Sequence, residues 1–469
     1  MTRPTLLESA RRIAPLAWPM YVGQIAVLAF GTVDTVMVAR HSALDLAALA
    51  IGGAAYISVF IGLMGVILAL GPIAGQLYGA GRLREAGRAL HQAMWLGLAL
   101  SIAGGALLLF PEPFLRLAEA PPDVATRARG YLAWLALALP ASLLFTAYRA
   151  FNVAVSRPKA VMALQLGGLL LKVPLTALLV FGLALPTPFG TLALPAYGAP
   201  GCGAATAIVT ICQIGVAWWV LRRDPFYRRF GLREPVSGPD RAVLAGLLRL
   251  GLPMGGSILI EVTGFTFMAF FISRIGPTPV AGHQIAVNLV SLMYMLPLAI
   301  ANASSTLVAQ RIGAGDAEGA RRIGWHGLEI GMLAGASVGA AAFLLRHAIL
   351  HAYTNDPVIV AAALPLLAWV ALFHLSDATQ AVASFILRAY RIVNLPLVIN
   401  AVAIWGIGLA GGYLLAFDIG GSTPAILKGA QGFWAAASFG LLATALAFVL
   451  LLVRTFRGEV RAVRSAAGA

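Results

Sequence analysis

Long apolar blocks separated by short polar breaks dominate the hydropathy pattern of the chain. Each block holds about 20 apolar residues, the length that a helix needs to cross a lipid bilayer. The pattern therefore predicts an all-α integral membrane protein with twelve transmembrane helices. The predicted spans are residues 14–38, 46–76, 90–110, 130–148, 160–182, 203–221, 248–273, 280–309, 323–345, 358–387, 393–417 and 432–453.

The second half of this pattern repeats the first at a fixed shift. The stretch Q-L-Y-G-A-G from Gln76 matches Q-R-I-G-A-G from Gln310, and Pro19-Met20 falls on Pro253-Met254 at the same shift. A six-span unit used twice predicts two six-helix lobes related by a pseudo-two-fold axis along the membrane normal. We expect residues 1–221 to form the first lobe, 222–247 a cytoplasmic linker and 248–469 the second lobe with a short basic tail.

Charged residues make up only 11% of the chain and hydrophobic residues 60%, which excludes an ordinary soluble protein. The net charge of +15 could suggest a nucleic-acid partner, but 24 of the 33 Lys and Arg residues fall on one side of the predicted topology and seven on the other. By the positive-inside rule, both termini face the cytoplasm. The charge thus reflects topology, and we expect the lipid bilayer and no nucleic acid as partner.

Three carboxylates interrupt the apolar spans: Asp34 in the first, Glu261 in the seventh and Asp377 in the tenth. An ionisable group at mid-membrane costs about 2.5–3.5 kcal/mol and marks a functional site by default. The acids are not repeated between the halves, so the fold does not require them. No inward-facing Arg is identified opposite them, and we expect them to exchange H⁺ or Na⁺ for a cationic organic substrate, with Na⁺ possible at Glu261 and Asp377.

Other polar residues of the spans are candidates for lining a cavity. They are Gln284, Asn288, His374 and Gln380, of which the last two lie three residues on either side of Asp377 and so on its side of the helix. Each could equally bridge helices by a hydrogen bond. At equivalent depths of spans one and seven, Pro19 and Pro253 are expected to kink the helices and form hinges.

Glycines recur in two kinds of pattern, one within the predicted helices and one in the predicted loops. Gly331, Gly335 and Gly339 have the four-residue spacing that lets helices approach closely in lipid. The G-A-G turns at Gly79 and Gly313 lie in predicted loops without the strand-turn-helix context of a nucleotide site. We therefore expect glycine packing between helices, and energy from an ion gradient.

Seven short motifs together carry a family resemblance: V-D-T at Asp34, Q-x-x-G-A-G, C-G-A-A-T-A-I at Cys202, E-V-T at Glu261, H-Q-I-A-V-N at His283, D-A-T-Q at Asp377 and Q-G-F-W at Gln431. With them the chain resembles the multidrug and toxic compound extrusion transporters of the NorM type. The resemblance implies export of organic cations driven by inward Na⁺ or H⁺, no cofactor, a monomer and a bacterial inner membrane. Asp34, Glu261 and Asp377 match the family's acids of spans one, seven and ten, and the resemblance implies that the last two hold the coupling cation, in the C-terminal lobe. The archaeal-type second acid in span five is absent, and Gln165 and Lys172 are the polar residues there.

Two other functions remain open from the sequence. A flippase or exporter of a lipid-linked or metabolite substrate has similar two-lobe helices, but it would be expected to have a basic cavity, and Lys172 is the clear basic exception inside a span. An intramembrane enzyme would need a clustered His and Asp motif at a membrane face, whereas the seven histidines are scattered. We therefore expect a transporter and not an enzyme.

Overall fold

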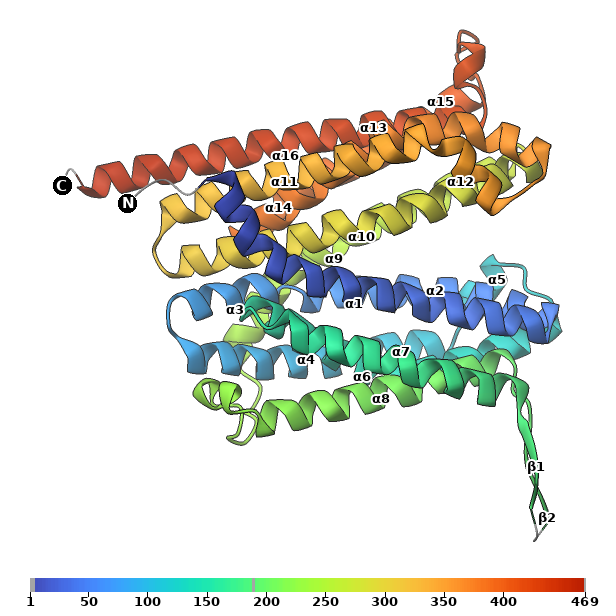
Figure 1. Cartoon of the computed structure of the whole chain (residues 1–469), viewed down its shortest axis with the longest axis horizontal. Helices are drawn as coiled ribbons and strands as arrows, with labels where there is room; N and C mark the ends of the chain where they lie inside the picture. Colours follow the sequence, from blue (N-terminus) through green and yellow to red (C-terminus); the bar gives the residue numbers. More distant parts are fainter. Residues whose placement is uncertain (1–4, 188–189, 468–469) are drawn as a thin grey trace. The chain divides into compact units, whose positions relative to one another are not determined.

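The computed structural model describes residues 5–187 and 190–467, and these are almost entirely helical (Figure 1). Twelve helices are long and apolar enough to cross a membrane, and no predicted span extends beyond its helix by more than one residue. They are Leu6–His41, Ala43–Gly79, Leu83–Leu109, Pro122–Ala154, Pro158–Phe181, Ala199–Arg223, Arg241–Ser273, Pro277–Gly313, Ala317–Leu344, Pro357–Ala389, Asn394–Ala416 and Ala430–Gly458. The predicted twelve-helix membrane fold is confirmed.

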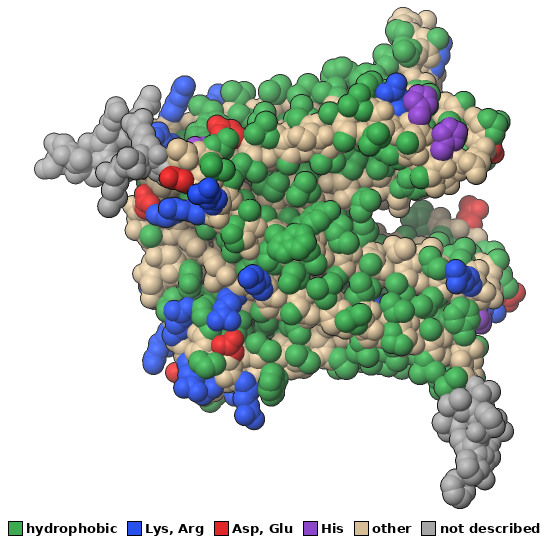
Figure 2. Space-filling view, in the orientation of Figure 1, with side chains coloured by type: hydrophobic (Ala, Val, Ile, Leu, Met, Phe, Trp, Pro, Cys, Tyr) green, Lys and Arg blue, Asp and Glu red, His purple; other side chains and the backbone are tan. Residues whose placement is uncertain are grey.

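Large apolar side chains remain exposed along many of these helices, among them Ile102, Leu170 and Leu333. Figure 2 shows hydrophobic side chains over the length of the helices and Lys and Arg side chains mostly near helix ends. On a soluble protein such apolar surface would mark a partner, but on membrane-crossing helices it faces lipid tails. The described chain is thus a multi-pass membrane protein.

The chain divides into two compact units, Val22–Gly255 (unit 2) and Met1–Tyr21 with Gly256–Ala469 (unit 1). The two boundaries fall at positions 21 and 255, which correspond to each other under the shift that relates the two halves of the sequence. Each boundary lies inside a continuous helix, α1 (Leu6–His41) or α9 (Arg241–Ser273). The units therefore differ from the predicted lobes in the first helix of each half, because each half contributes the start of that helix to the other half's unit.

Unit 2 is built around α6 (Pro122–Ala154), which packs against α2 (Ala43–Ile67), α4 (Leu83–Leu109) and α8 (Ala199–Arg223). It also contains α3 (Leu70–Gly79), α5 (Glu112–Leu117), α7 (Pro158–Phe181) and the 3₁₀ turn η1 (Pro225–Phe230). Between α7 and α8, β1 (Leu183–Thr187) pairs antiparallel with β2 (Gly190–Leu194). The sequence analysis did not predict this hairpin.

Unit 1 is built around α13 (Pro357–Ala389), which packs against α10 (Pro277–Gly313), α11 (Ala317–Leu344) and α16 (Ala430–Ala467). Its smaller elements are α12 (Arg346–Tyr353), α14 (Asn394–Asn400), the π-helix η2 (Ala401–Ala410), α15 (Gly411–Ala416) and η3 (Ala425–Leu427). Phe373 and Trp434 are almost fully buried at its core, with their rings 5.4 Å apart.

The predicted glycine packing joins α11 to α13. A Cβ added at Gly331 would lie 2.6 Å from Val382 Cγ2, one at Gly335 2.5 Å from Ala378 Cβ, and one at Gly339 3.0 Å from the Ala371 carbonyl oxygen. Successive turns of α11 therefore rest directly on α13, and a side chain at these glycines would press against it. This contact positions the helix that carries Asp377.

Candidate functional site

Unit 1 brings two of the three predicted acids together. Glu261 lies on α9 and is half-buried, and Asp377 lies on α13 with 9% of its surface exposed. Gln380, one turn after Asp377, donates a hydrogen bond from Nε2 to Glu261 Oε1 at 2.8 Å. The two carboxyl groups are close enough to interact electrostatically. Gln380 thus links α13, the helix that carries Asp377, to Glu261 on α9.

Two further residues of unit 1 surround these acids, and the sequence analysis missed both. Arg388 is buried near the end of α13, within electrostatic range of Glu261, and its guanidinium stacks 4.4 Å over the Phe385 ring. Tyr294 of α10 lies within range of both carboxyl groups and of Arg388. The expectation that no arginine lies opposite the acids is wrong for Glu261, because Arg388, one residue beyond the predicted tenth span, extends back over Phe385 of its own helix and comes within range of Glu261.

The backbone around Glu261 is held by the π-helix η2. Trp405 of η2 donates from Nε1 to the carbonyl of Ile260 at 3.2 Å, and a Cβ added at Gly264 would lie 2.8 Å from Ile404. On the same helix, Thr263 donates its hydroxyl to the carbonyl of Leu259 at 2.5 Å. These contacts place Glu261 on a fixed stretch of α9, with its carboxyl group directed to α13.

His374 is fully buried on α13, three residues before Asp377. Neither of its ring nitrogens has a hydrogen-bond partner in the described part of the chain, so His374 does not bridge helices by a hydrogen bond there. In contrast, His283 accepts a hydrogen bond at Nδ1 from Trp434 Nε1 at 3.2 Å and joins α10 to α16.

The remaining cavity candidates lie on an exposed face of α10. Gln284 and Asn288, one turn apart, are both exposed. Asn288 Oδ1 accepts a hydrogen bond from the Tyr353 hydroxyl of α12 at 2.7 Å. The described contacts do not bring either residue to the acids, and Asn288 acts as a link between two helices.

In unit 2, Asp34 is part of a buried ion pair. Lys172 Nζ lies 2.9 Å from Asp34 Oδ1 and 3.0 Å from Oδ2, and the lysine is completely buried. Lys172 also donates to Thr206 Oγ1 at 2.5 Å and to the Cys202 carbonyl at 3.4 Å. Asp34 therefore has a basic partner that is not an arginine: Lys172, the polar residue noted in span five.

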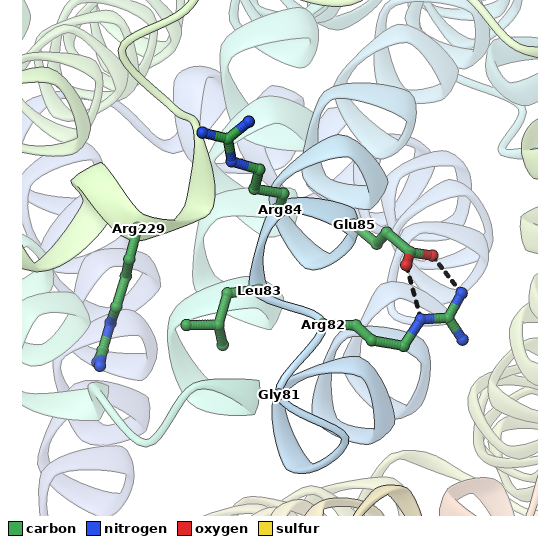
Figure 3. Close-up of a pocket in the computed structure, with 6 residues that line it drawn as sticks. All are labelled: Gly81, Arg82, Leu83, Arg84, Glu85 and Arg229. Atoms are coloured by element: carbon green, nitrogen blue, oxygen red, sulfur yellow. Dashed lines mark hydrogen bonds and ion pairs between the residues drawn. The ribbon is translucent and has the colours of Figure 1, made fainter.

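An open surface pocket of about 320 Å³ lies where α4 begins, lined by Gly81, Arg82, Leu83, Arg84, Glu85 and Arg229 (Figure 3). Arg82 and Glu85 pair through hydrogen bonds of 2.6 and 2.5 Å. The G-A-G turn here joins two helices, α3 and α4, with a φ of +73° at Gly81. The turn is thus preceded by a helix and not by a strand.

The donor atoms around Glu261 suit a small cation without a dedicated metal centre. No three His, Cys, Asp or Glu side chains gather in a metal-binding arrangement within residues 5–187 and 190–467. The Gln380 carbonyl oxygen, however, is buried without a hydrogen-bond partner, on the same amide that donates to Glu261. Carboxylate and carbonyl oxygens are the ligands of hard cations, so the group fits Na⁺ or a proton better than a transition metal.

The chain is similar over nearly its whole length to named proteins and to solved structures. It is 40% identical over 448 residues to the probable multidrug resistance protein NorM of Aromatoleum aromaticum, with 94% of this chain and 92% of that protein covered. The NorM protein of Neisseria meningitidis serogroup B is 33% identical over 459 residues, with 98% and 97% covered. Among solved structures, the eukaryotic MATE transporter AtDTX14 superposes with a TM-score of 0.84 at 20% identity, with 98% of this chain and 99% of that chain covered.

The family model described as MatE matches the chain twice, at residues 19–178 and 253–414. The two matches begin at Pro19 and Pro253, so they reproduce the internal shift between the two halves of the sequence. Together they cover more than half of the sequence. The chain therefore belongs to the MatE family of multidrug and toxic compound extrusion transporters, of the NorM type, whose members are transporters and not enzymes.

Proposed function

We propose that this protein exports organic cations by antiport, with Na⁺ or H⁺ entering the cell as the drug leaves. Glu261 and Asp377 hold the coupling cation, and Gln380 positions Glu261. The name of the two NorM relatives, multidrug resistance protein, supports the substrate class. Occupation of the acids by a proton or a sodium ion and occupation by a drug cation exclude each other, and this competition couples the two fluxes.

The observation that carries the proposal is the buried, unpartnered carbonyl oxygen of Gln380, whose amide group is bonded to Glu261, an acid within electrostatic range of Asp377. An unpaired buried acceptor costs free energy unless a ligand completes it. A cation bound there would satisfy that oxygen and neutralise the excess acid charge. With both carboxyl groups ionised, Arg388 balances one of two negative charges, so the cluster then has capacity for one more monovalent cation.

Rocking of the two units between inward-open and outward-open states would carry the substrate across. The chain passes from one unit to the other inside α1 and α9, two residues after Pro19 and Pro253 respectively. A proline inside a helix removes one backbone hydrogen bond and lowers the resistance to bending. We propose that both prolines are the hinges of this motion.

The cellular setting follows the same proposal. The charge asymmetry of the loops supports a multi-pass protein of the bacterial inner membrane with both termini in the cytoplasm. Small-molecule cations and the lipid bilayer are its partners, and one chain forms the working unit. Apart from the coupling ion, we propose no cofactor.

The test is efflux of a fluorescent organic cation from proteoliposomes in which Na⁺ and pH gradients are imposed separately. Glu261→Gln removes the charge at nearly constant shape and should lower gradient-driven export by about tenfold or more, the effect of losing one strong interaction with the ion. Glu329→Gln is the matched control, because Glu329 is an exposed glutamate of α11 outside the cluster.

Export in the Glu329→Gln protein should equal that of the native protein. Driving by Na⁺ alone, or by the pH gradient alone, identifies the coupling ion. Equal export by the Glu261→Gln and Glu329→Gln proteins would remove Glu261 from the mechanism. Absence of export with either gradient in the native protein would refute the antiport proposal.

A further inference from the structure

Unit 2 holds a second oxygen cluster that the proposed coupling mechanism does not use. Its members come from three helices: Asp34 from α1, Lys172 and Thr176 from α7, and Cys202 and Thr206 from α8. Thr176 lies one turn after Lys172, next to the Asp34 carboxyl group. Asp34 has 8% of its surface exposed, and Lys172 and Thr176 have none. The cluster is therefore a built interior site.

The hydrogen bonds of this cluster define its chemistry. The ammonium of Lys172 has three N–H donors, and three partners receive them: Asp34, Thr206 and the Cys202 carbonyl. The Thr206 hydroxyl donates a hydrogen bond to the same Cys202 carbonyl at 3.0 Å, so the Thr206 oxygen acts as an acceptor for Lys172. The oxygens of a carboxylate, a hydroxyl and a carbonyl group thus all contact the ammonium nitrogen of Lys172.

This ligand set is that of a small monovalent cation. Hard cations are bound by carboxylate, carbonyl and hydroxyl oxygens, and the ammonium nitrogen stands where such an ion would stand. The stem of Lys172 reaches the point from α7 without any solvent-exposed surface. The positive charge at this site is therefore part of the chain and does not come from the medium.

We propose that Asp34, Thr206 and the Cys202 carbonyl form a monovalent-cation site that Lys172 fills permanently with its own ammonium group. In the native protein, unit 2 consequently takes up no Na⁺ from the medium, and ion coupling is confined to Glu261 and Asp377. Lys172 is a specificity-determining residue, since its charge decides how many cations one chain binds. Only this assignment of coupling to unit 1 rests on the proposed function.

The test removes the built-in cation and offers a free one. Lys172→Ala deletes the ammonium and three methylene groups, which n-propylammonium or Na⁺ can replace. The apparent Tm of the purified protein is measured in rising Na⁺ or n-propylammonium, with N-methyl-D-glucamine keeping the ionic strength constant. A new site that binds the cation only in the folded protein adds a stabilisation that grows with the logarithm of the cation concentration. The Tm of Lys172→Ala should therefore rise more steeply with cation concentration than the Tm of the native protein. Where unit 1 also binds the cation, the slope should be about twice the native slope, because two sites contribute in place of one.

Three further variants make the result specific to this site. Lys159→Ala, at an exposed lysine at the start of the same helix, should keep the native dependence. Asp34→Asn with Lys172→Ala should lose the added dependence, because the carboxylate is gone. Asp34→Asn alone preserves the shape of the buried pair and should keep the native dependence, which tests the proposal even where Lys172→Ala does not fold.

Two results would overturn the proposal. One is a folded Lys172→Ala protein whose Tm depends on cation concentration no more steeply than the native Tm. The other is an Asp34→Asn protein whose Tm depends on it less steeply than the native Tm. Both readouts are binding-linked stabilities of the purified protein and do not involve export. A failure of the antiport proposal in proteoliposomes would therefore be seen separately from a failure of this one.

Discussion

The contact between α11 and α13 gives a prediction whose size follows from the geometry. Gly335→Ala places a methyl carbon 2.5 Å from Ala378 Cβ, whereas carbon atoms in contact lie about 3.5–4.0 Å apart. Ala378 Cβ is fixed to its backbone and cannot rotate away, so the helices must separate by about 1 Å. Overpacking of this kind costs about 1–3 kcal/mol, and the higher helix propensity of alanine returns about 0.5–1 kcal/mol. The net loss should be about 1–2 kcal/mol.

Thermal unfolding of the purified protein in detergent measures this loss. A decrease of about 2–8 °C in apparent Tm is expected for Gly335→Ala, at about 2–4 °C per kcal/mol. Gly331→Ala should cost less, because the Val382 Cγ2 methyl group that it meets can change rotamer. Gly167→Ala is the control, since nothing lies within 4 Å of a Cβ on that exposed helix position, and its Tm should stay or rise slightly. Equal Tm values for Gly335→Ala and Gly167→Ala would refute the packing argument.

Two further predictions concern the coupling site and a helix end. Gln380→Ala removes the 2.8 Å hydrogen bond that orients Glu261, so the coupling-cation concentration at half-maximal export should rise by about tenfold; an unchanged value would exclude Gln380 as a positioning residue. At the start of α11, Asp316 accepts a hydrogen bond from the Gly319 amide at 2.8 Å and so caps the helix. This bond and the nearby Arg311 hold the pKa of Asp316 below its usual value. Asp316→Ala should therefore destabilise the protein by about 1 kcal/mol near neutral pH. Because the folded-state pKa is lowered, this difference is complete above the ordinary Asp pKa of about 4 and disappears as the pH falls through the lowered value, which denaturation at several pH values would reveal; a pH-independent difference would contradict it.

The sequence predicted those features that depend on long periodic patterns. All twelve spans follow from blocks of about 20 apolar residues, because a bilayer imposes that length on every crossing helix. The acids Glu261 and Asp377 stood out by their cost in lipid, and Gln380 by its spacing of three residues from Asp377. The β1–β2 hairpin was missed because its ten paired residues are too few to produce a comparable pattern.

Partners across helices were beyond the reach of sequence spacing. Lys172 was visible as a basic residue inside a span, but nothing along the chain indicated that its ammonium meets Asp34, 138 residues away. Arg388 was assigned to a loop because it sits close to a helix end, where arginines usually face the cytoplasm. A long side chain can reach back along its own helix, and only the packing of α9 against α13 shows that Arg388 does so.

The division of α1 and α9 between the two units bears on how such a duplicated chain arose. Each half of the sequence lacks the opening segment of its own unit and supplies it to the other, at equivalent positions of the repeat. A single-half ancestor would have completed its fold only by pairing with a second copy that exchanged the starts of their first helices, as in a domain-swapped dimer. In the present chain the same exchange takes place between the two halves of one polypeptide, so each unit is complete only when both halves are present.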